Sequence, residues 1–388
     1  MERSTIKAGE DDIRAAVAVS SDGRSIAPTM DPTALRGEFP VLRSVAYLNT
    51  GTNGPVPRRA AQAAALQVVA EAERGRTGAA HYAYVTELKT RVRERLAALF
   101  GCAAGELAIT HSTTDGLNTV LGGFPLGPGD EVLTTDEEHP GLLAPLATAR
   151  ERRGFSVRVV PFHEIAGEVG ASTRLVACSH VSWVTGQVVD LEALGATGVP
   201  VALDGAQGLG AVPTRALELG CDYYAASGQK WLCGPDASGC LYVRQGAEEH
   251  LGAPWPGYES LSDPGLALEL ELHDGARRFD VGPLPGPLAA WWLASLDVLA
   301  AAGWDAVSHR AVDLAGRLAS MLQERGYEVA ARGESTLVSW RMDDPEVVVN
   351  RLAEARVMVR HLPGRGLVRA SVGAWNGEHD LERLLSAL

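Results

Sequence analysis

The chain has 388 residues, 46% of them hydrophobic, and this length predicts two or three structural units with a sizeable core. Its formal net charge of -13 leaves no broad basic surface for phosphates, which argues against nonspecific binding to nucleic acid. Five cysteines occur without CxxC spacing, so we expect reduced thiols, no metal site and a cytoplasmic protein. No apolar run approaches the ~20 residues that span a bilayer, and no secretory signal pattern is present, so no membrane partner is expected.

The first hundred residues are predicted to contain an N-terminal extension, a loop and two helices. Residues 1–30 are polar and mixed in charge, and we expect a mobile N-terminal extension there. The Gly/Pro/Asn-rich stretch YLNTGTNGPVP (Tyr47–Pro57) sets the backbone direction before an Ala-rich helix from Arg58 to about Arg74. A second helix is predicted over Val85–Phe100.

A pattern of short apolar run, loop and helix then repeats along the chain. Alternating strands and helices predict an α/β fold whose mostly parallel central sheet is covered by helices on both faces. In such sheets ligands bind at the loops that follow the carboxyl ends of the strands. The predicted strands are Glu106–Thr110, Asp130–Thr135, Ser156–Phe162, Thr173–Val181, Val199–Gln207, Cys221–Ser227 and Ser238–Arg244.

From about Pro285 the pattern changes to two long helices, two strand-like segments and a closing helix. This indicates a smaller α+β C-terminal domain over residues 286–388. The larger, ligand-binding domain is predicted over residues 31–285, and its first part is a candidate to pack with the smaller domain.

Ser112, Thr113 and Thr114 stand where the first strand ends and a helix begins. Free N–H groups and the positive end of the helix dipole make such a position suitable for phosphate. A plain Ser/Thr helix cap is the better explanation when these residues are taken alone.

Two further strand ends carry His139, in DEEHPG, and Asp204, in VALDGAQ. A histidine can lie on an aromatic ligand or move a proton, although an ordinary loop histidine is the better explanation when His139 is taken alone. A carboxylate at the end of so apolar a strand requires a cation or hydrogen-bond donors, unless Asp204 merely caps the next turn. Gln207 follows three residues later.

Lys230 lies in the segment YYAASGQKWLCGP, between an apolar strand and a Trp-Leu-Cys run. A buried lysine has a lowered pKa and becomes a nucleophilic amine, whereas a surface lysine would extend its amine into water. Ser227 and Gln229 beside it can donate hydrogen bonds to an anion.

Four groups follow successive strand ends along the chain. In order, they are a candidate phosphate-binding helix start, a histidine that could stack on a ring, a carboxylate and a lysine. Together they are the parts that hold pyridoxal phosphate, with Lys230 forming the Schiff base and Asp204 keeping the pyridine nitrogen protonated. Arg369, in GLVRASVGAWN, could bind the α-carboxylate of an amino-acid substrate through its two-pronged guanidinium.

On these residues the chain resembles the class V aminotransferases, which are fold-type I pyridoxal-phosphate enzymes, over about Tyr47 to Leu388. SGQKWLCGP and YLNTGTNGPVP are most similar to the isopenicillin N epimerase branch, and the layout is similar to cysteine desulfurases. The resemblance implies a homodimer with shared active sites, in which Gly282 of the RRFDVGPLPGP stretch contacts the partner's cofactor. It also implies the remaining roles: His139 stacked on the ring, Gln207 near the phenolic oxygen, Asn49 and Arg369 at the substrate, and Thr113, Thr114, Ser227 and Gln229 around the phosphate.

Four departures from the family pattern bear on the reaction. No cysteine lies between Val357 and Arg369, where desulfurases carry their nucleophile, so sulfur transfer by that route is not expected. Trp183 replaces an amide that usually binds substrate or cofactor oxygen, which indicates either an apolar wall at the substrate or a packed core tryptophan. Gly282-Pro283 stands where relatives often have Gly-Thr. Arg360 and Arg365 could bind a second acidic group, but surface charges are the preferred explanation.

The function predicted from these motifs starts with an α-amino acid bound through Lys230 and a carbanion formed at Cα. A C–S (β-elimination) lyase or an aminotransferase of specialised metabolism is favoured, and an amino-acid epimerase is the alternative. A regulatory protein that binds the cofactor without turnover is more remote, because Lys230, Asp204 and Arg369 are all present. A nucleotide-binding protein is not favoured, because neither GxxxxGK[ST] nor GxGxxG follows a strand.

Overall fold

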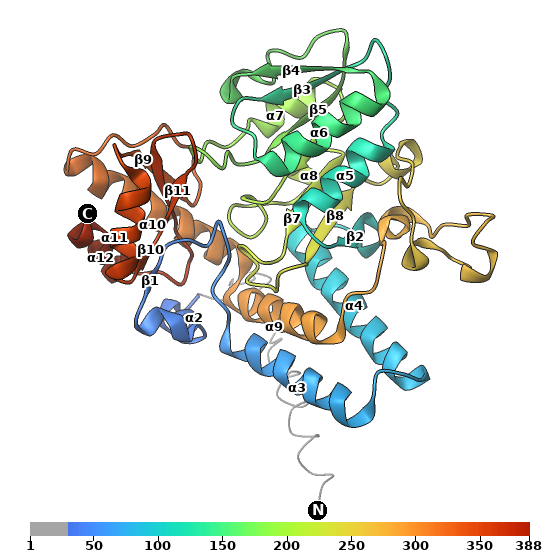
Figure 1. Ribbon diagram of the computed structural model, residues 1–388, viewed down its shortest axis with the longest axis horizontal. Coiled ribbons are helices and arrows are strands. Elements are labelled where there is room, and N and C mark those ends of the chain that lie inside the picture. The colour runs from blue at the N-terminus through green and yellow to red at the C-terminus, as the bar shows by residue number, and fades with distance from the viewer. Residues whose placement is uncertain (1–29) are drawn as a thin grey trace, which may run out of the picture.

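The computed structural model describes residues 30–388, so the extension predicted for residues 1–30 lies, up to residue 29, outside the described residues. Figure 1 shows a larger unit built around one sheet and a smaller unit that contains the C-terminus. The order of strands in the seven-stranded sheet is β2-β8-β7-β6-β5-β3-β4. These strands are β2 (Leu107–Thr110), β3 (Glu131–Thr135), β4 (Ser156–Val160), β5 (Thr173–Ser179), β6 (Val201–Asp204), β7 (Tyr223–Ser227) and β8 (Gly239–Val243).

The sheet is mostly parallel, as predicted. Strands β7, β6, β5, β3 and β4 pair in parallel, whereas β8 runs antiparallel to both of its neighbours, β2 and β7. Every residue of β6 and β7 is buried, which is typical of strands covered on both faces. The carboxyl ends of the parallel strands therefore meet at one edge, where Asp204 ends β6 and Ser227 ends β7.

Helices cover both faces of this sheet. On one face, α5 (Thr113–Gly123) and α6 (Pro140–Arg153) pack against Ala108, Val132 and Ala202. Ile109, Leu133 and Leu203 lie on the other face of the sheet. This face is covered by α4 (Ala79–Phe100), α7 (Leu191–Ala196), α8 (Ala216–Leu219) and α9 (Gly286–Ala302). Successive strand residues thus enter different cores, as the two-residue period of a strand requires.

The smaller unit has its own hydrophobic core. It contains a three-stranded antiparallel sheet of order β11-β12-β9 and a pair of short parallel strands, β1 and β10. Its elements are β9 (Leu337–Arg341), β10 (Val357–Met358), β11 (Arg360–Leu362), β12 (Leu367–Ser371), α10 (Trp304–Glu324), α11 (Pro345–Glu354) and α12 (Glu378–Ala387).

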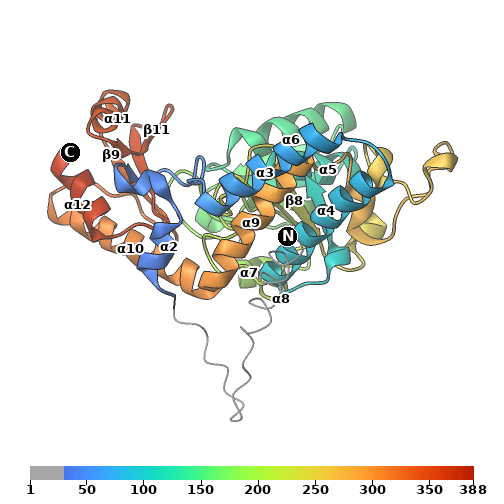
Figure 2. The same ribbon diagram turned by 90° about the horizontal axis from the view of Figure 1, so that it is seen from below.

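The N-terminal segment and α9 connect the two units. Strand β1 (Ala46–Tyr47) pairs with β10, and Leu48 lies in the core of the smaller unit. Helix α9 begins at the predicted boundary, but it packs beside α3 (Arg58–Arg74) and α4, as Figure 2 shows from below. Its Trp292 belongs to the core of the large sheet. The domain boundary at residue 285 therefore stays a prediction.

The remaining described elements are short. They are α2 (Pro32–Gly37) and the 3-10 turns η1 (Pro40–Arg43), η2 (Ala104–Glu106), η3 (Phe162–Glu164), η4 (Ala247–His250), η5 (Tyr258–Ser260), η6 (Pro264–Leu266) and η7 (Gly275–Phe279). Within residues 30–388 no single helix has the length and apolar character to cross a membrane, and only the bent pair of α9 and α10 meets that test jointly. No group of three or more metal-ligating side chains occurs in the same part of the chain.

Candidate active site

Lys230 lies in the loop that follows β7, against the N-terminal loop of the chain. The Gly54 N–H donates to the Gln229 carbonyl at 2.7 Å, and a Cβ at Gly54 would lie 2.1 Å from the Lys230 carbonyl oxygen. Only glycine allows this approach. Burial lowers the pKa of Lys230 to about 8; nearby Asp204 opposes the shift, and Arg369 and Arg360 add to it. The amine is thus available as a base or nucleophile near neutral pH.

Asp204 is the last residue of β6 and is 5% exposed. Its Oδ1 accepts a hydrogen bond from the Ala206 N–H at 2.9 Å, and its carbonyl accepts from the His180 N–H at 2.9 Å. Burial raises the pKa of the carboxyl, while Lys230 acts in the opposite direction. A buried carboxylate with one backbone donor retains free acceptor capacity for a cationic group.

Beneath Asp204, the His180 ring meets the Tyr224 hydroxyl at 2.9 Å. Burial lowers the pKa of His180 to about 4, so its imidazole is neutral. Sequence reasoning gave His180 no role, and its position directly after β5 is the signal that could have found it.

Thr113 and Ser227 meet at the N-terminus of α5. Their hydroxyl oxygens lie 2.6 Å apart, and the Thr113 N–H donates to Ser227 Oγ at 3.2 Å. Ser112 caps the helix by accepting from the Asp115 N–H at 3.1 Å. A Cβ on Gly141 would lie 2.6 Å from Thr114 Oγ1, so the N-termini of α5 and α6 converge on this place.

His139 is the N-cap of α6, and its Nδ1 accepts from the Gly141 N–H at 2.9 Å. Its ring meets the Trp183 ring edge to face, with centroids 5.0 Å apart and an angle of 85° between the planes. Partial burial lowers the pKa of His139 to about 4, and Lys230, Arg360 and Arg369 add to the effect. The imidazole is therefore neutral and held by its backbone contact.

Three consecutive acids anchor the loop that presents His139. Asp136 Oδ1 accepts from the Phe162 N–H at 3.1 Å, and Glu137 Oε2 accepts from Thr185 Oγ1 at 2.7 Å. Glu138 is 2% exposed, and its carboxylate accepts from the Thr135 hydroxyl at 2.5 Å and from the Ser179 hydroxyl and N–H at 2.6 and 3.0 Å. Burial raises the pKa of Glu138 to about 7. Sequence reasoning missed these roles, because a DEE run is usually a solvated surface.

Arg369 lies in β12 and is fully buried. Its Nη1 donates to the Trp183 carbonyl at 2.6 Å, whereas its Nε and Nη2 have no partner within residues 30–388. Burial lowers its pKa to about 9, and Arg360 adds to that shift. A Cβ on Gly51 would lie 3.1 Å from Arg369 Nη2 and 2.7 Å from Ser371 Oγ. Because Gly51 has no side chain, the Arg369 guanidinium and the Ser371 hydroxyl beside it stay accessible as donors suited to a carboxylate.

The other predicted residues occupy different positions. Gln207 is held at both ends, because its Nε2 donates to the Gly51 carbonyl at 2.8 Å and its Oε1 accepts from Trp231 Nε1 at 3.0 Å. Asn49 forms a bridge to Ser371 and accepts from Thr52 Oγ1 at 2.9 Å.

Gly282 lies beside α4, where its carbonyl accepts from Lys89 Nζ at 3.5 Å. Within residues 30–388 of one chain, no hydrogen bond joins Gly282 to the other site residues. Its contact with a partner's cofactor stays a prediction, as do the individual roles of the other predicted residues.

The surface-charge explanation preferred for Arg360 is wrong, because its side chain is partly buried in the site. Its Cζ lies 5.8 Å from the centroid of the Trp183 ring, and its Nη1 donates to Thr52 Oγ1 at 3.3 Å. Arg365 is exposed, and its Nη2 donates to the Asp136 carbonyl at 3.0 Å. Arg360 is therefore partly buried beside Trp183, whereas Arg365 is a surface residue.

These residues fit pyridoxal phosphate. Thr113 and Ser227 place hydroxyl groups at a helix N-terminus, which suits a phosphate. The buried Gln229 Oε1 has no partner within residues 30–388, as expected of an atom that faces a ligand. Asp204 can accept from a protonated ring nitrogen, and Lys230 is an amine with a lowered pKa.

Comparisons with known proteins agree with this arrangement. The family model for Aminotransferase class-V matches residues 47–384. A probable cysteine desulfurase of Pseudomonas aeruginosa is 33% identical over 318 residues, which cover 73% of this chain and 77% of that protein. Isopenicillin N epimerase of Streptomyces clavuligerus is 27% identical over 407 residues and covers 91% of this chain and 96% of its own length.

Among solved structures, the protein C-DES is similar in two forms. A C-DES mutant with glycine covalently linked to the PLP cofactor has a TM-score of 0.86 and 28% identity, covering 90% of this chain and 98% of its own. The complex between the cystine C-S lyase C-DES and its reaction product cysteine persulfide has a TM-score of 0.85, with the same identity and coverage. Both the fold and the cofactor thus match those inferred from the residues.

Proposed function

The chain belongs to the class V aminotransferase family, and on that premise we propose that it uses pyridoxal phosphate to cleave the carbon–sulfur bond of an S-substituted cysteine. The reaction would be a β-elimination. The observation that carries this proposal is the lack of a cysteine in the connection between β11 and β12, which is Pro363-Gly364-Arg365-Gly366. A sulfur-transferring desulfurase needs a thiolate there, whereas an elimination needs no second nucleophile.

The cysteines elsewhere in the chain are poorly suited to that role. Cys233, three residues after Lys230, is 1% exposed, and burial raises its pKa well above the ordinary value. Burial also raises the pKa of the half-buried Cys102 to about 12. The thiolate forms that would accept sulfur are therefore disfavoured at neutral pH. This supports a lyase over a cysteine-dependent desulfurase, although several relatives are named cysteine desulfurases.

The residues of the site can perform the elimination in a balanced way. Bound pyridoxal phosphate supplies the electron sink for the pair released from the Cα–H bond. Lys230 Nζ takes the Cα proton, the Cβ–S bond breaks with its electron pair on sulfur, and the thiolate leaves with one proton. Arg369 holds the α-carboxylate during these steps through its free Nε and Nη2. Water hydrolyses the remaining aminoacrylate to pyruvate and ammonia, and no oxidant is required.

Two other outcomes start from the same proton transfer. An aminotransferase would return the proton to the cofactor carbon, and an epimerase would return it to the other face of Cα. The epimerase is the alternative with specific support, because isopenicillin N epimerase covers 91% of this chain. Specialised metabolism stays a prediction that rests on Trp183 alone.

A panel of amino acids, including S-substituted cysteines, would separate these outcomes. The cofactor absorbance is followed while pyruvate, ammonia and chirality are assayed. A retained cofactor band with release of pyruvate and ammonia supports the lyase. Loss of that band, restored only by a keto acid, would establish transamination, and racemisation without ammonia would establish epimerisation.

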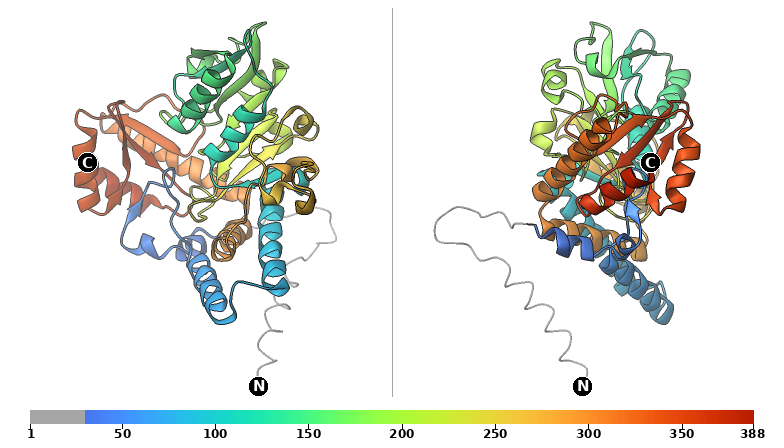
Figure 3. Two further views of the ribbon diagram at one scale, coloured as in Figure 1. Left: turned by 45° about the vertical axis from the view of Figure 1, so that its right-hand side comes forward. Right: turned by 90° about the vertical axis from the view of Figure 1, so that its left-hand side faces the viewer.

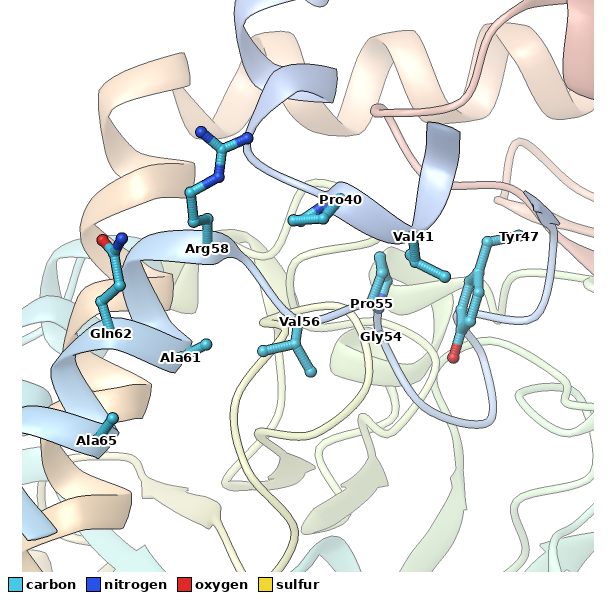
Figure 4. A pocket seen from close by; sticks show the side chains of 10 residues that line it. All are labelled: Pro40, Val41, Tyr47, Gly54, Pro55, Val56, Arg58, Ala61, Gln62 and Ala65. Atoms are coloured by element: carbon cyan, nitrogen blue, oxygen red, sulfur yellow. The ribbon is translucent and has the colours of Figure 1, made fainter. Parts of the chain in front are cut away.

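We also propose that the protein is a cytoplasmic homodimer. Exposed apolar side chains lie on α3, on α4 and on the segment 255–270. The backbone of this segment projects from the larger unit (Figures 1 and 3). Beside the start of α3 is a hollow of about 540 Å³, lined by Val41, Tyr47 and Val56 among others (Figure 4). Apolar surfaces of this kind favour association with a second copy.

A further inference from the structure

The Lys230 loop, residues 228–238, connects β7 to β8 and is held by two side chains of helix α9. Trp291 Nε1 donates to the Cys233 carbonyl at 3.0 Å, and Ser295 Oγ donates to the same carbonyl at 2.8 Å. Because Trp291 and Ser295 are four residues apart, they project from the same side of the helix. A serine inside a helix can donate to a carbonyl of its own helix, whereas the fully buried Ser295 donates out of α9. Helix α9 therefore directs two donors at one backbone carbonyl of the Lys230 loop.

Cys233 requires such support because its backbone is left-handed. Its φ of 52° lies in a region that disfavours residues with a Cβ, and the surrounding structure must offset this cost. The same turn closes the loop around Lys230, since the Cys233 N–H donates to the Lys230 carbonyl at 3.1 Å. The next residue continues this closure, because the Gly234 N–H donates to the Gly228 carbonyl at 2.8 Å. The conformation of Cys233 and the backbone position of Lys230 are therefore set together.

Close packing surrounds the rest of the turn. A Cβ on Gly228 would lie 2.8 Å from the Trp292 ring, and a Cβ on Gly234 would lie 2.7 Å from the same ring. From the N-terminal loop of the chain, a Cβ on Gly54 would lie 3.0 Å from Cys233 Sγ. Apolar packing limits where the turn lies but has no preferred direction, whereas hydrogen bonds are directional. The two donors of α9 are thus the contacts that orient the Cys233 carbonyl.

We propose that Ser295 and Trp291 are positioning residues, which direct the amine of Lys230 toward the cofactor by holding the Cys233 carbonyl. The side chain of lysine is long and flexible, so its own conformational preferences do not fix the position of Nζ. A small rotation of the backbone at its base therefore displaces the amine, and a misplaced reacting group lowers the rate. The inference goes beyond the proposed function, because it requires only bound pyridoxal phosphate, whichever reaction follows.

Three substitutions test this support. Ser295→Ala removes one donor, Trp291→Phe removes the other but keeps an aromatic ring, and Ser295→Thr keeps the hydroxyl. The full-length protein, freed of cofactor, is mixed with pyridoxal phosphate, and the rate at which the cofactor absorbance develops is measured against pH. At pH ~8 we expect this rate to fall about tenfold in Ser295→Ala, in keeping with the loss of one buried hydrogen bond. Trp291→Phe should be slower by a similar factor, and Ser295→Thr should retain most of the original rate.

The pH midpoint of this rate is the second readout. Burial is the main cause of the lowered pKa of Lys230, with Asp204 opposing the shift and Arg369 and Arg360 adding to it. A displaced amine loses part of its burial, so the midpoint in Ser295→Ala should move to higher pH. Ser308→Ala is the matched control, because Ser308 on α10 is also buried and its Oγ donates to the Asp305 carbonyl at 3.1 Å, outside the Lys230 loop. Its rate and midpoint should equal those of the unmodified protein.

Two results would overturn the inference. One is an unchanged rate and midpoint in Ser295→Ala. The other is an equal change in Ser295→Ala and Ser308→Ala, which would mean that the rate follows general stability. If Ser295→Ala does not fold, Trp291→Phe decides the question, because an unchanged rate and midpoint in that variant would also overturn the inference. No amino acid is present in this test, so a failure to release pyruvate would count against the proposed C–S cleavage alone.

Discussion

Glu138 connects the ends of two strands by accepting two hydrogen bonds from Ser179, at 2.6 Å from the hydroxyl and 3.0 Å from the N–H. It also accepts from Thr135, so β3 and β5 are joined directly before His139. This buried carboxylate is a positioning group, because it contacts the loop that presents His139, for which the sequence predicts a ring-stacking role. The catalytic loop is thereby fixed before any ligand binds.

The first prediction concerns the charge of Glu138. Its folded pKa of about 7 lies above the ordinary value, so the folded state binds more protons than the unfolded state between pH ~5 and ~7. Stability from this group is present below pH ~5 and is lost as pH rises through ~7. Glu138→Gln keeps an acceptor without the charge. As the pH rises from 5 to 8, we expect the thermal unfolding midpoint of this variant to increase relative to that of the unmodified protein.

Glu138→Leu is the contrasting variant for this test. It removes both acceptors and leaves the Ser179 N–H buried without a partner, which costs about 1–3 kcal/mol. We expect its cofactor absorbance maximum to shift as the His139 loop relaxes, whereas Glu138→Gln should keep the original spectrum. Identical spectra for all three proteins would contradict the positioning role.

The second prediction concerns Lys230. Its pKa of about 8 means that the neutral amine dominates above pH ~8, rather than above the ordinary value of 10.5. The rate at which the apoprotein combines with pyridoxal phosphate should therefore rise with pH and level off above ~8. Arg360 lowers this pKa, so Arg360→Met should move the midpoint to higher pH. A midpoint that Arg365→Met moves equally would contradict the local origin of the effect.

Much of this fold could be predicted from the sequence, because apolar runs and the loop residues that separate them are local signals. Each of the seven predicted strands contains an observed one, and Asp204 and Ser227 end strands as expected. Helix α4 begins at Ala79, six residues before the predicted start. The short strands β1 and β10 escaped prediction because they have two residues each and are held by a partner about 300 residues away.

The site was harder to predict where it depends on pairing across strands. Arg360 acquires its importance from its register opposite Arg369 and from the ring of Trp183, and neither relation is visible along the chain. The anchoring role of Glu137 likewise depends on a turn 48 residues further on, where Thr185 donates to it. Local sequence shows which groups are available, but tertiary contacts decide which of them work together.

The third prediction tests the space beside Gly51. A Cβ there would lie 2.7 Å from Ser371 Oγ and 2.8 Å from Gln207 Oε1, inside the distance that real contacts allow. We expect Gly51→Ala to raise KM by at least about tenfold, because the added methyl group occupies the place of the α-carboxylate. Gly37→Ala is the matched control, since a Cβ at Gly37 would meet nothing within 4 Å. An unchanged KM in Gly51→Ala would place the carboxylate elsewhere.

The fourth prediction tests the homodimer. Leu66, on α3, is 72% exposed, and Val347, on α11, is 66% exposed but lies in the smaller unit. If α3 is covered by a second copy, Leu66→Glu should shift the mass measured by light scattering from dimer toward monomer. Val347→Glu should leave the mass unchanged. A monomer in the unmodified protein, or equal effects of the two changes, would argue against the proposed interface.

The fifth prediction concerns Trp183, whose ring contacts the His139 ring and lies beside the Arg360 guanidinium, and whose carbonyl accepts from Arg369. Trp183→Asn introduces an amide and keeps the backbone acceptor, so the hydrogen bond from Arg369 Nη1 to the carbonyl of residue 183 should survive. The hold on Arg360 depends on the ring and should weaken. We therefore expect kcat/KM for bulky sulfur substituents to change several-fold, while the value for a small substituent changes less, because the bulk of the ring is removed from the site. If the order of preferred substrates stays the same, Trp183 is a packing residue and the selectivity has another source.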